Sequence, residues 1–150
     1  MLNIVSPVPA GISRQRLNRA FDLVFAKLKP KASWQINLAF VTKSRSRELN
    51  KRYASNDYPT DVLSFNYQEG SKISVNDNQF IGDIIICPSI AKSQASKFKT
   101  DLTNEICLLL VHAVIHLLGY DHKGNTQQAG FEALQNAIIS ELKLSSRILT

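Results

Sequence analysis

Cysteine is scarce in this sequence, with two residues among 150. Cys87 and Cys107 both lie within apolar stretches, where cysteine usually behaves as a small buried hydrophobic residue. Two such cysteines do not make a disulfide scaffold, and they fit a reducing compartment. We therefore expect a cytoplasmic protein.

Long hydrophobic runs are also missing. The longest apolar stretch, residues 106–120, is interrupted by two histidines and is shorter than the about 20 residues that a membrane-spanning helix needs. The opening segment MLNIVSPVPAG has neither a basic region nor a long apolar run before a cleavage site. We expect neither a membrane anchor nor secretion.

Acidic residues are few in the first part of the chain. Residues 1–60 contain eleven Lys or Arg and three Asp or Glu, whereas residues 61–150 contain seven and nine. This asymmetry favours a positively charged face that attracts a polyanion, although a basic surface that only keeps the protein in solution has the same pattern. The hydrophobic content of 44% and charged content of 20% are typical of one folded domain, here residues 1–150.

The hydrophobic pattern alternates between helical and strand periodicity. Strands are expected at residues 2–5, 34–41, 61–67 and 79–87, and the last two are expected to pair. Helices are expected at 13–29, from about 44 to 53, and at 89–98, 103–118 and 126–143. Strands with interspersed helices indicate an α+β or a mixed α/β fold.

All three histidines lie in the segment HAVIHLLGYDH, residues 112–122. His112 and His116 are four residues apart on the expected helix, so both rings lie on one face and can point at one ion. Gly119 can adopt the left-handed conformation that ends a helix and turns the chain back, which would bring His122 to the same point. The spacing predicts a metal site at the end of a central helix.

Three imidazoles favour Zn²⁺, with Ni²⁺ or another divalent transition metal as alternatives. A fourth, open coordination position would hold water and lower its pKa to about 7, which makes a nucleophile at neutral pH. The alternative is that His112 and His116 are satisfied within the core and His122 is merely exposed in a loop. Three histidines at this spacing favour the metal.

The residues around the ligands limit the chemistry. A zinc protease of the H-E-x-x-H type has a glutamate after the first histidine as its general base, whereas this sequence has Ala113. Asp121 is the nearest carboxylate, and it could orient a ligand, take a proton or only cap a turn. The catalytic acid and base are therefore left unassigned.

With this histidine segment and NDYPTDVLSF and GDIII upstream of it, the sequence resembles the YbeY family, the bacterial rRNA-maturation endoribonucleases, from about Leu49 to Ile139. The resemblance implies an α+β fold with a small, mostly parallel mixed sheet packed by helices and a metal cleft. It matches His112, His116 and His122 to the family's zinc ligands. It implies a zinc-dependent endoribonuclease that prefers single strands and acts in 16S rRNA 3′-end maturation and ribosome quality control, with rRNA, the 30S subunit and assembly factors as partners.

Several positions depart from the family pattern, including Leu108 and Ala113, where the family often has histidine and usually has glycine. Its important arginine follows the tyrosine of L-N-x-x-Y-R, where this chain has Ala54. Arg52 lies two residues earlier, about 200° around a helix, and is expected to point nearly the opposite way. A glutamate that the family has near Gln135 is also absent.

Basic residues near these positions are the candidates for RNA contact: Arg45, Lys51 and Arg52, with Lys43 and Arg47 beside them. The alternative function is a ribosome-associated assembly factor that binds rRNA and uses its metal mainly for folding. That alternative predicts that metal removal unfolds the protein, whereas the enzyme should stay folded without its metal. Hydrolysis of another substrate, such as a peptide, is disfavoured by Ala113.

Overall fold

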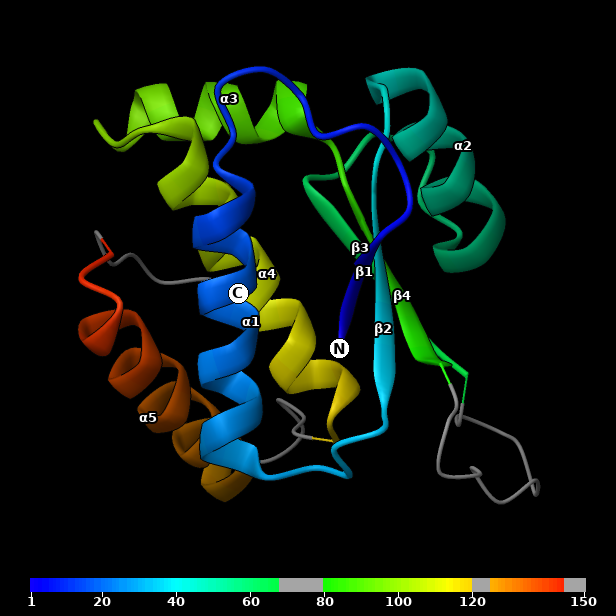
Figure 1. Ribbon diagram of the computed structural model, residues 1–150. Coiled ribbons are helices and arrows are strands. Elements are labelled where there is room, and N and C mark those ends of the chain that lie inside the picture. Colours follow the sequence, from blue (N-terminus) through cyan, green and yellow to red (C-terminus); the bar gives the residue numbers. More distant parts are fainter. Residues whose placement is uncertain (68–79, 120–124, 145–150) are drawn as a thin grey trace.

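The computed structural model describes residues 1–67, 80–119 and 125–144, without the side chains of 125–128. The elements follow in this order: β1 Leu2–Ile4, α1 Arg14–Leu28, β2 Gln35–Phe40, α2 Lys43–Ala54, β3 Val62–Asn66, β4 Phe80–Ile86, α3 Pro88–Lys97, α4 Leu102–Leu117 and α5 Asn125–Glu141. Figure 1 shows their arrangement. The predicted strands and helices are all present.

The strands form one mixed sheet in the order β1-β2-β4-β3. β1, β2 and β4 are parallel, whereas β3 is antiparallel to β4 and lies at the edge. This confirms the α+β class with a small, mostly parallel sheet and the pairing of the last two strands. β3 and β4 are successive strands in the order of the described elements, and β4 separates β3 from the other parallel strands of the sheet.

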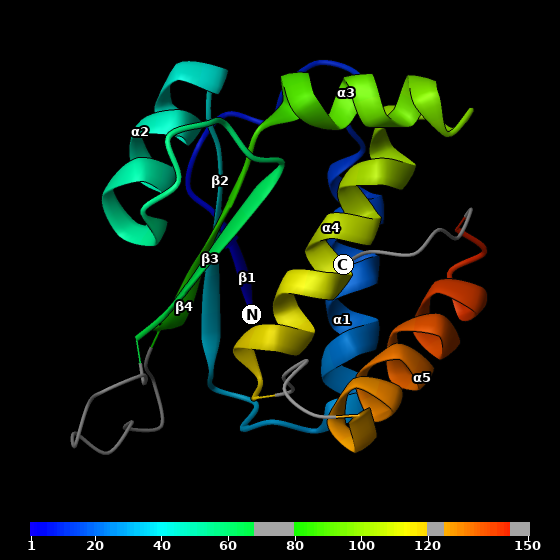
Figure 2. The same ribbon diagram turned by 180° about the vertical axis from the view of Figure 1, so that it is seen from behind.

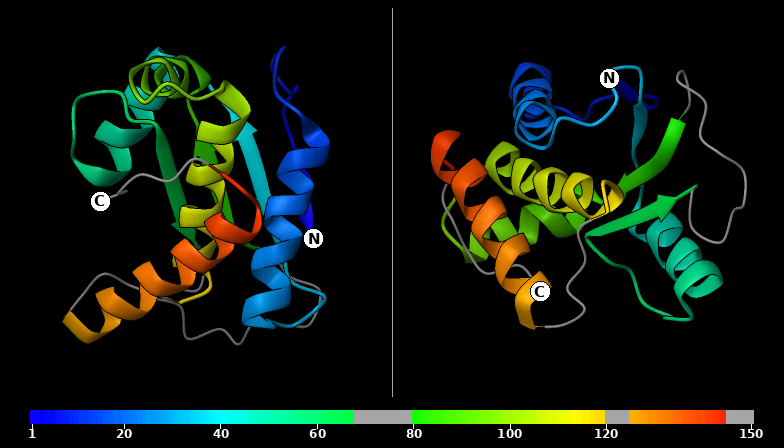
Figure 3. Two further views of the ribbon diagram at one scale, coloured as in Figure 1. Left: turned by 90° about the vertical axis from the view of Figure 1, so that its left-hand side faces the viewer. Right: turned by 90° about the horizontal axis from the view of Figure 1, so that it is seen from below.

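Helices cover the two faces of the sheet unequally. In Figure 1 and in the view from below in Figure 3, α1 and α4 lie on one face while α2 alone lies on the other. Figure 2 shows α5 on the outer side of α4 and α1, away from the sheet. The fold is therefore layered, with α4 between the sheet and α5.

The start of α1 shows how local sequence fixes an element. The hydroxyl of Ser13 accepts a hydrogen bond from the Arg16 backbone amide at 3.2 Å, as predicted for a cap. The helix ends at Lys29, whose φ of 48° is left-handed, and Pro30 follows. One face of α1 packs into the core through Leu17, Ala20, Phe21 and Val24.

α4 is the central helix of the core. Asp101 caps its start by accepting from the Asn104 amide at 2.7 Å. All its side chains are buried except Leu102 and His116, which are half-buried. The largest fully buried side chains come from all layers: Phe21, Phe131, Leu17, Ile36, Leu38, Ile81, Ile84, Ile86, Ile106, Leu108, Leu109 and Leu110. A helix this apolar forms the core whether or not its histidines bind an ion.

The junction of β3, β4 and α4 depends on Gly82. A methyl group there would lie 2.5 Å from the Phe65 carbonyl oxygen and 2.9 Å from Cδ2 of Leu117. The side-chain amide of Asn66 also donates to the Leu117 carbonyl at 3.5 Å. Glycine thus lets the end of α4 approach the sheet closely.

Most element boundaries differ from the prediction by one or two residues, and α3, for example, begins at Pro88 and not at Ser89. Proline suits the first position of a helix, where no amide hydrogen bond is lost. Within the described ranges no single helix is long and apolar enough to cross a membrane, and only α3 and α4 together, bent by 112° at their break, reach that length and hydropathy.

Candidate metal centre and nucleic-acid-binding helix

The end of α4 brings two of the three predicted ligands together. The rings of His112 and His116 have centroids 4.8 Å apart and planes at 74°. His112 is 9% exposed and His116 is half-buried, at the one place where the second half of α4 reaches solvent. The predicted helical juxtaposition is therefore confirmed.

Gly119 has the left-handed conformation predicted for the end of α4, with a φ of 100° and its amide donating to the His116 carbonyl at 3.0 Å. His122 and Asp121 lie outside the described residues. Within the ranges that are described, no cluster of three His, Cys, Asp or Glu side chains is present. The complete ligand set thus remains a prediction.

α5 supplies a partner for the histidine pair. Nδ1 of His112 lies 2.8 Å from Oε1 of Gln135, which is 4% exposed. With Oε1 as the acceptor, Nδ1 of His112 is the donor, and in a neutral imidazole this leaves Nε2 unprotonated, as a metal ligand must be. A ligating histidine typically donates its other N–H to a carboxylate or carbonyl in this way, so the pair fits a divalent metal ion.

Phe131 closes the apolar side of the pair. Its ring centroid lies 5.1 Å from that of His112 and 4.8 Å from that of His116. Phe131 and Gln135 are four residues apart and therefore on the same face of α5. The sequence analysis noted Gln135 only as the absence of a glutamate and did not predict its contact with His112. An amide between the apolar residues Phe131 and Ile138 on one face of a helix could have indicated a buried hydrogen-bond partner.

Ala113 is 2% exposed and belongs to the core. The position at which a zinc protease has its catalytic glutamate is thus filled by packing in this chain. The free cysteines Cys87 and Cys107 are also buried. Burial raises the pKa of the Cys107 thiol to about 11, so it stays protonated at neutral pH.

The predicted RNA-contact residues lie on α2. Arg45 and Arg52 are seven residues apart and share a side of the helix, whereas Lys51 is about 240° around from Arg45. Nη1 of Arg45 pairs with Glu48 at 2.8 Å, and Nζ of Lys51 lies 3.8 Å from Asp57. The structure therefore groups Arg45 with Arg52 and places Lys51 on another side.

Arg47 and Asp57 connect α2 to the segment that follows it. The Arg47 guanidinium donates to Asp57 at 2.8 Å, and this hydrogen bond lowers the pKa of that carboxyl group. Ala54 is the last residue of α2 and is exposed. The guanidinium carbon of Arg52 lies over the Tyr53 ring, 5.4 Å from its centroid.

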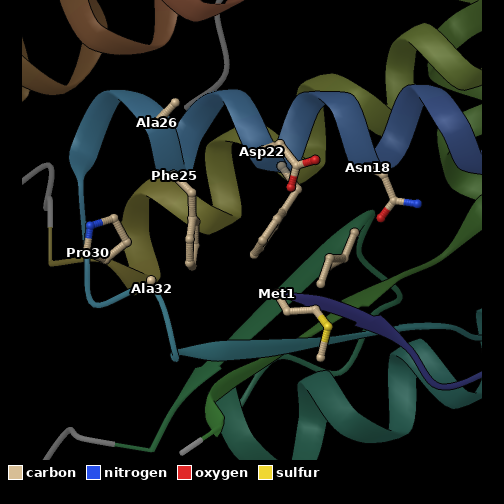
Figure 4. Close-up of a pocket in the computed structure, with 9 residues that line it drawn as sticks. Met1, Asn18, Asp22, Phe25, Ala26, Pro30 and Ala32 are labelled. Carbon is tan, nitrogen blue, oxygen red and sulfur yellow. The ribbon is translucent and has the colours of Figure 1, made fainter. Parts of the chain in front are cut away.

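A separate pocket of about 590 Å³ lies between α1 and the first strand, and among the described residues none of the predicted site residues lines it. Figure 4 shows Phe25 pointing from α1 into this space, with Met1 on the opposite wall. The Met1 ammonium group donates to the Trp34 carbonyl at 2.7 Å. Burial lowers the pKa of that ammonium group, whereas its hydrogen bond links the first strand to the chain before β2.

Comparison with known proteins identifies relatives over most of the chain. The family model described as "Endoribonuclease YbeY" matches residues 8–143. A protein of that name from Ureaplasma parvum is 36% identical over 134 residues, which cover 89% of this chain and 84% of that one. One from Staphylococcus epidermidis is 35% identical over 129 residues, covering 82% and 83%.

A solved structure shares the fold. The solution structure of a Thermotoga maritima protein matches with a TM-score of 0.59 and 22% identity, over 95% of this chain and 92% of that one. At this identity the match supports the arrangement of helices and strands alone. The family model and the sequence relatives go further and show that this chain belongs to the endoribonuclease YbeY family.

Proposed function

We propose that this protein is a metal-dependent endoribonuclease that cleaves phosphodiester bonds in single-stranded RNA. The observation that carries the proposal is the paired His112 and His116 at the open end of α4, with His112 oriented by Gln135. This pair occurs in a chain whose relatives are named endoribonucleases. One domain, residues 1–150, would contain the whole site.

His112, His116 and His122 would hold one Zn²⁺ ion, or Ni²⁺ or another divalent transition metal. When bound, such an ion supplies a Lewis acid and lowers the pKa of coordinated water. The chain's own part would be to hold His112 in the tautomer whose Nε2 carries no proton, through Gln135, and to exclude water from one side of the pair through Phe131. Half-buried His116 leaves the other side open to a substrate.

RNA is the substrate that the charge pattern favours. The net charge is +6, and the basic excess lies in the first 60 residues, which include α2. Arg45 and Arg52 lie on one side of that helix and would contact phosphates of the RNA, and Lys51 would add charge on another side. Such contacts bind the backbone of RNA without reading its sequence.

The setting that we propose is ribosome maturation in the cytoplasm. It comprises processing of the 3′ end of 16S rRNA and ribosome quality control, with the 30S subunit and assembly factors as partners. This part of the proposal rests on the YbeY resemblance together with the family membership. It extends the site chemistry to a particular RNA.

The test is cleavage of a labelled single-stranded RNA by zinc-loaded protein and by His116→Ala. We expect the wild type to cut and His116→Ala to lose cutting, because one ligand of three is removed while α4 stays packed. Asn136→Ala, an exposed amide on α5, is the matched control and should cut like the wild type. Cleavage that survives His116→Ala in metal-free buffer would refute the proposal.

A further inference from the structure

A pocket of about 500 Å³ lies on the face of the sheet that α2 covers. Its size is within the about 300–1,000 Å³ that small-molecule sites occupy. Three aromatic rings, an arginine and a central-strand carboxylate contribute to it. The lining residues are Ala39, Val41, Arg45, Leu49, Tyr53, Phe65, Tyr67, Asp83 and Ile85.

The aromatic side chains of this pocket are unusually accessible. Tyr53 is 59% exposed and Tyr67 is 47% exposed. Tyr53 meets Phe65 edge to face, with centroids 5.3 Å apart and planes at 73°. This contact leaves most of the Tyr53 ring in solvent. Packing in the core therefore does not explain an aromatic residue at this position.

Asp83 of β4 and Tyr67, the residue after β3, contribute polar groups to the pocket lining. Asp83 of β4 is the register partner of Asn37 and of Phe65. Its carboxylate accepts from the Asn37 amide at 3.0 Å and from the Tyr67 hydroxyl. Hydrogen-bonding groups beside aromatic rings are the combination that recognises an unpaired base in RNA.

Arginines of α2 border the same space. Arg45 lines the pocket, and the guanidinium of Arg52 lies over the Tyr53 ring. Both are on one side of the helix, so a nucleotide whose base enters the pocket would have its phosphate within reach of a positive charge. An acidic ligand that has no aromatic ring could pair with the arginines but could not stack on the aromatic side chains of the pocket.

The pocket and the histidine pair lie on opposite faces of the sheet near its β3 edge. Phe65 and Tyr67 face the pocket, whereas the intervening Asn66 donates to the Leu117 carbonyl at the end of α4. The route from one site to the other therefore crosses a single edge strand, as the view from below in Figure 3 shows for β3, α2 and α4. An extended strand can follow such a route, but a rigid duplex cannot place a base in the pocket.

We propose that the pocket between α2 and the sheet binds one unpaired base of the RNA substrate, stacked on Tyr53, while the neighbouring phosphodiester reaches the histidines around the β3 edge. This inference rests on the proposed function, since it needs RNA as the ligand. It assigns Tyr53 to substrate binding and adds nothing to the cleavage step itself. The preference for single strands follows from it.

The experiment measures binding of a short fluorescein-labelled single-stranded RNA by anisotropy, in a chelator so that no cleavage occurs. Loss of base–aromatic stacking should weaken binding by Tyr53→Ala about 5- to 150-fold. Tyr53→Phe keeps the ring and should bind like the wild type. Tyr58 is 57% exposed and does not line the pocket, so Tyr58→Ala is the matched control and should also bind normally.

Three outcomes would overturn the inference. The first is unchanged RNA binding by Tyr53→Ala. The others are a loss of RNA affinity in Tyr53→Phe or in Tyr58→Ala as large as the loss in Tyr53→Ala. Because Tyr53 is 59% exposed, its replacement should leave the circular dichroism spectrum and unfolding midpoint unchanged. If the wild type binds single-stranded RNA and Tyr53→Ala binds equally well, the base pocket fails while the endoribonuclease proposal stands. If the wild type binds no single-stranded RNA, both fail.

Discussion

Gln135 offers the sharpest test of how the fold prepares the histidine pair. We expect Gln135→Leu, which removes the acceptor for Nδ1 of His112 while keeping much of the volume, to weaken zinc binding. Loss of such an outer partner typically lowers metal affinity about 10- to 100-fold, equivalent to about 1.4–2.7 kcal/mol. Gln135→Glu restores an acceptor, so its affinity should be at least that of the wild type.

The same substitution should also destabilise the metal-free protein. His112 and Gln135 are 9% and 4% exposed, so water cannot readily replace the lost hydrogen bond. A buried N–H left without its acceptor costs about 1–3 kcal/mol. Denaturant unfolding in a chelator should record this loss for Gln135→Leu.

The assay for affinity is competition for zinc against a chromogenic chelator. Asn136→Ala, at the next and exposed position of α5, controls for effects on the helix and should leave affinity unchanged. Wild-type zinc affinity in Gln135→Leu would refute the reasoning, because it would mean that His112 needs no partner to present Nε2. A loss of equal size in Gln135→Glu would refute it too.

Three further predictions concern the fold and the pocket. Gly82→Ala should destabilise the protein by about 1–3 kcal/mol in denaturant unfolding, since its methyl group would clash with the Phe65 carbonyl; wild-type stability would contradict this. Chelation should lower the thermal midpoint but leave the helical circular dichroism spectrum intact, because α4 is buried by apolar packing; unfolding on chelation would favour the assembly-factor alternative. Partial desolvation and the hydrogen bond to Asp83 raise the pKa of half-exposed Tyr67 to about 12, so its contribution to stability is complete below pH 10 and is lost between about pH 10 and 12. Absorbance titration should show one late tyrosine that Tyr67→Phe removes, and an unchanged late phase would refute the assignment.

The fold was largely predictable because its elements carry local signals. Ser13 and Pro30 bracket α1, and the Cα spacing of His112 and His116 required only that residues 103–118 form a helix. The predicted left-handed conformation of Gly119 is also confirmed, since no other residue type adopts its φ of 100° so readily. These features depend on neighbours in sequence.

Features that depend on distant contacts were not predictable from spacing. The hydrogen bond between His112 and Gln135 joins residues 23 apart, on two helices whose packing no local pattern specifies. The pocket that Tyr53 and Asp83 share likewise needs α2 to pack against the sheet. Helical geometry already places Lys51 on a different side of α2 from Arg45 and Arg52. The sequence analysis grouped the three residues by charge alone and did not use this geometry.

The central claim is that three imidazoles of this chain converge on one ion. X-ray absorption spectroscopy of the zinc-loaded protein tests it directly, because the spectrum identifies the ligand atoms. The account predicts scattering from three imidazole rings and one oxygen ligand around the zinc in the wild type. In His122→Ala the number of imidazole ligands should fall to two. Sulfur in the first shell, or a spectrum that His122→Ala leaves unchanged, would contradict it.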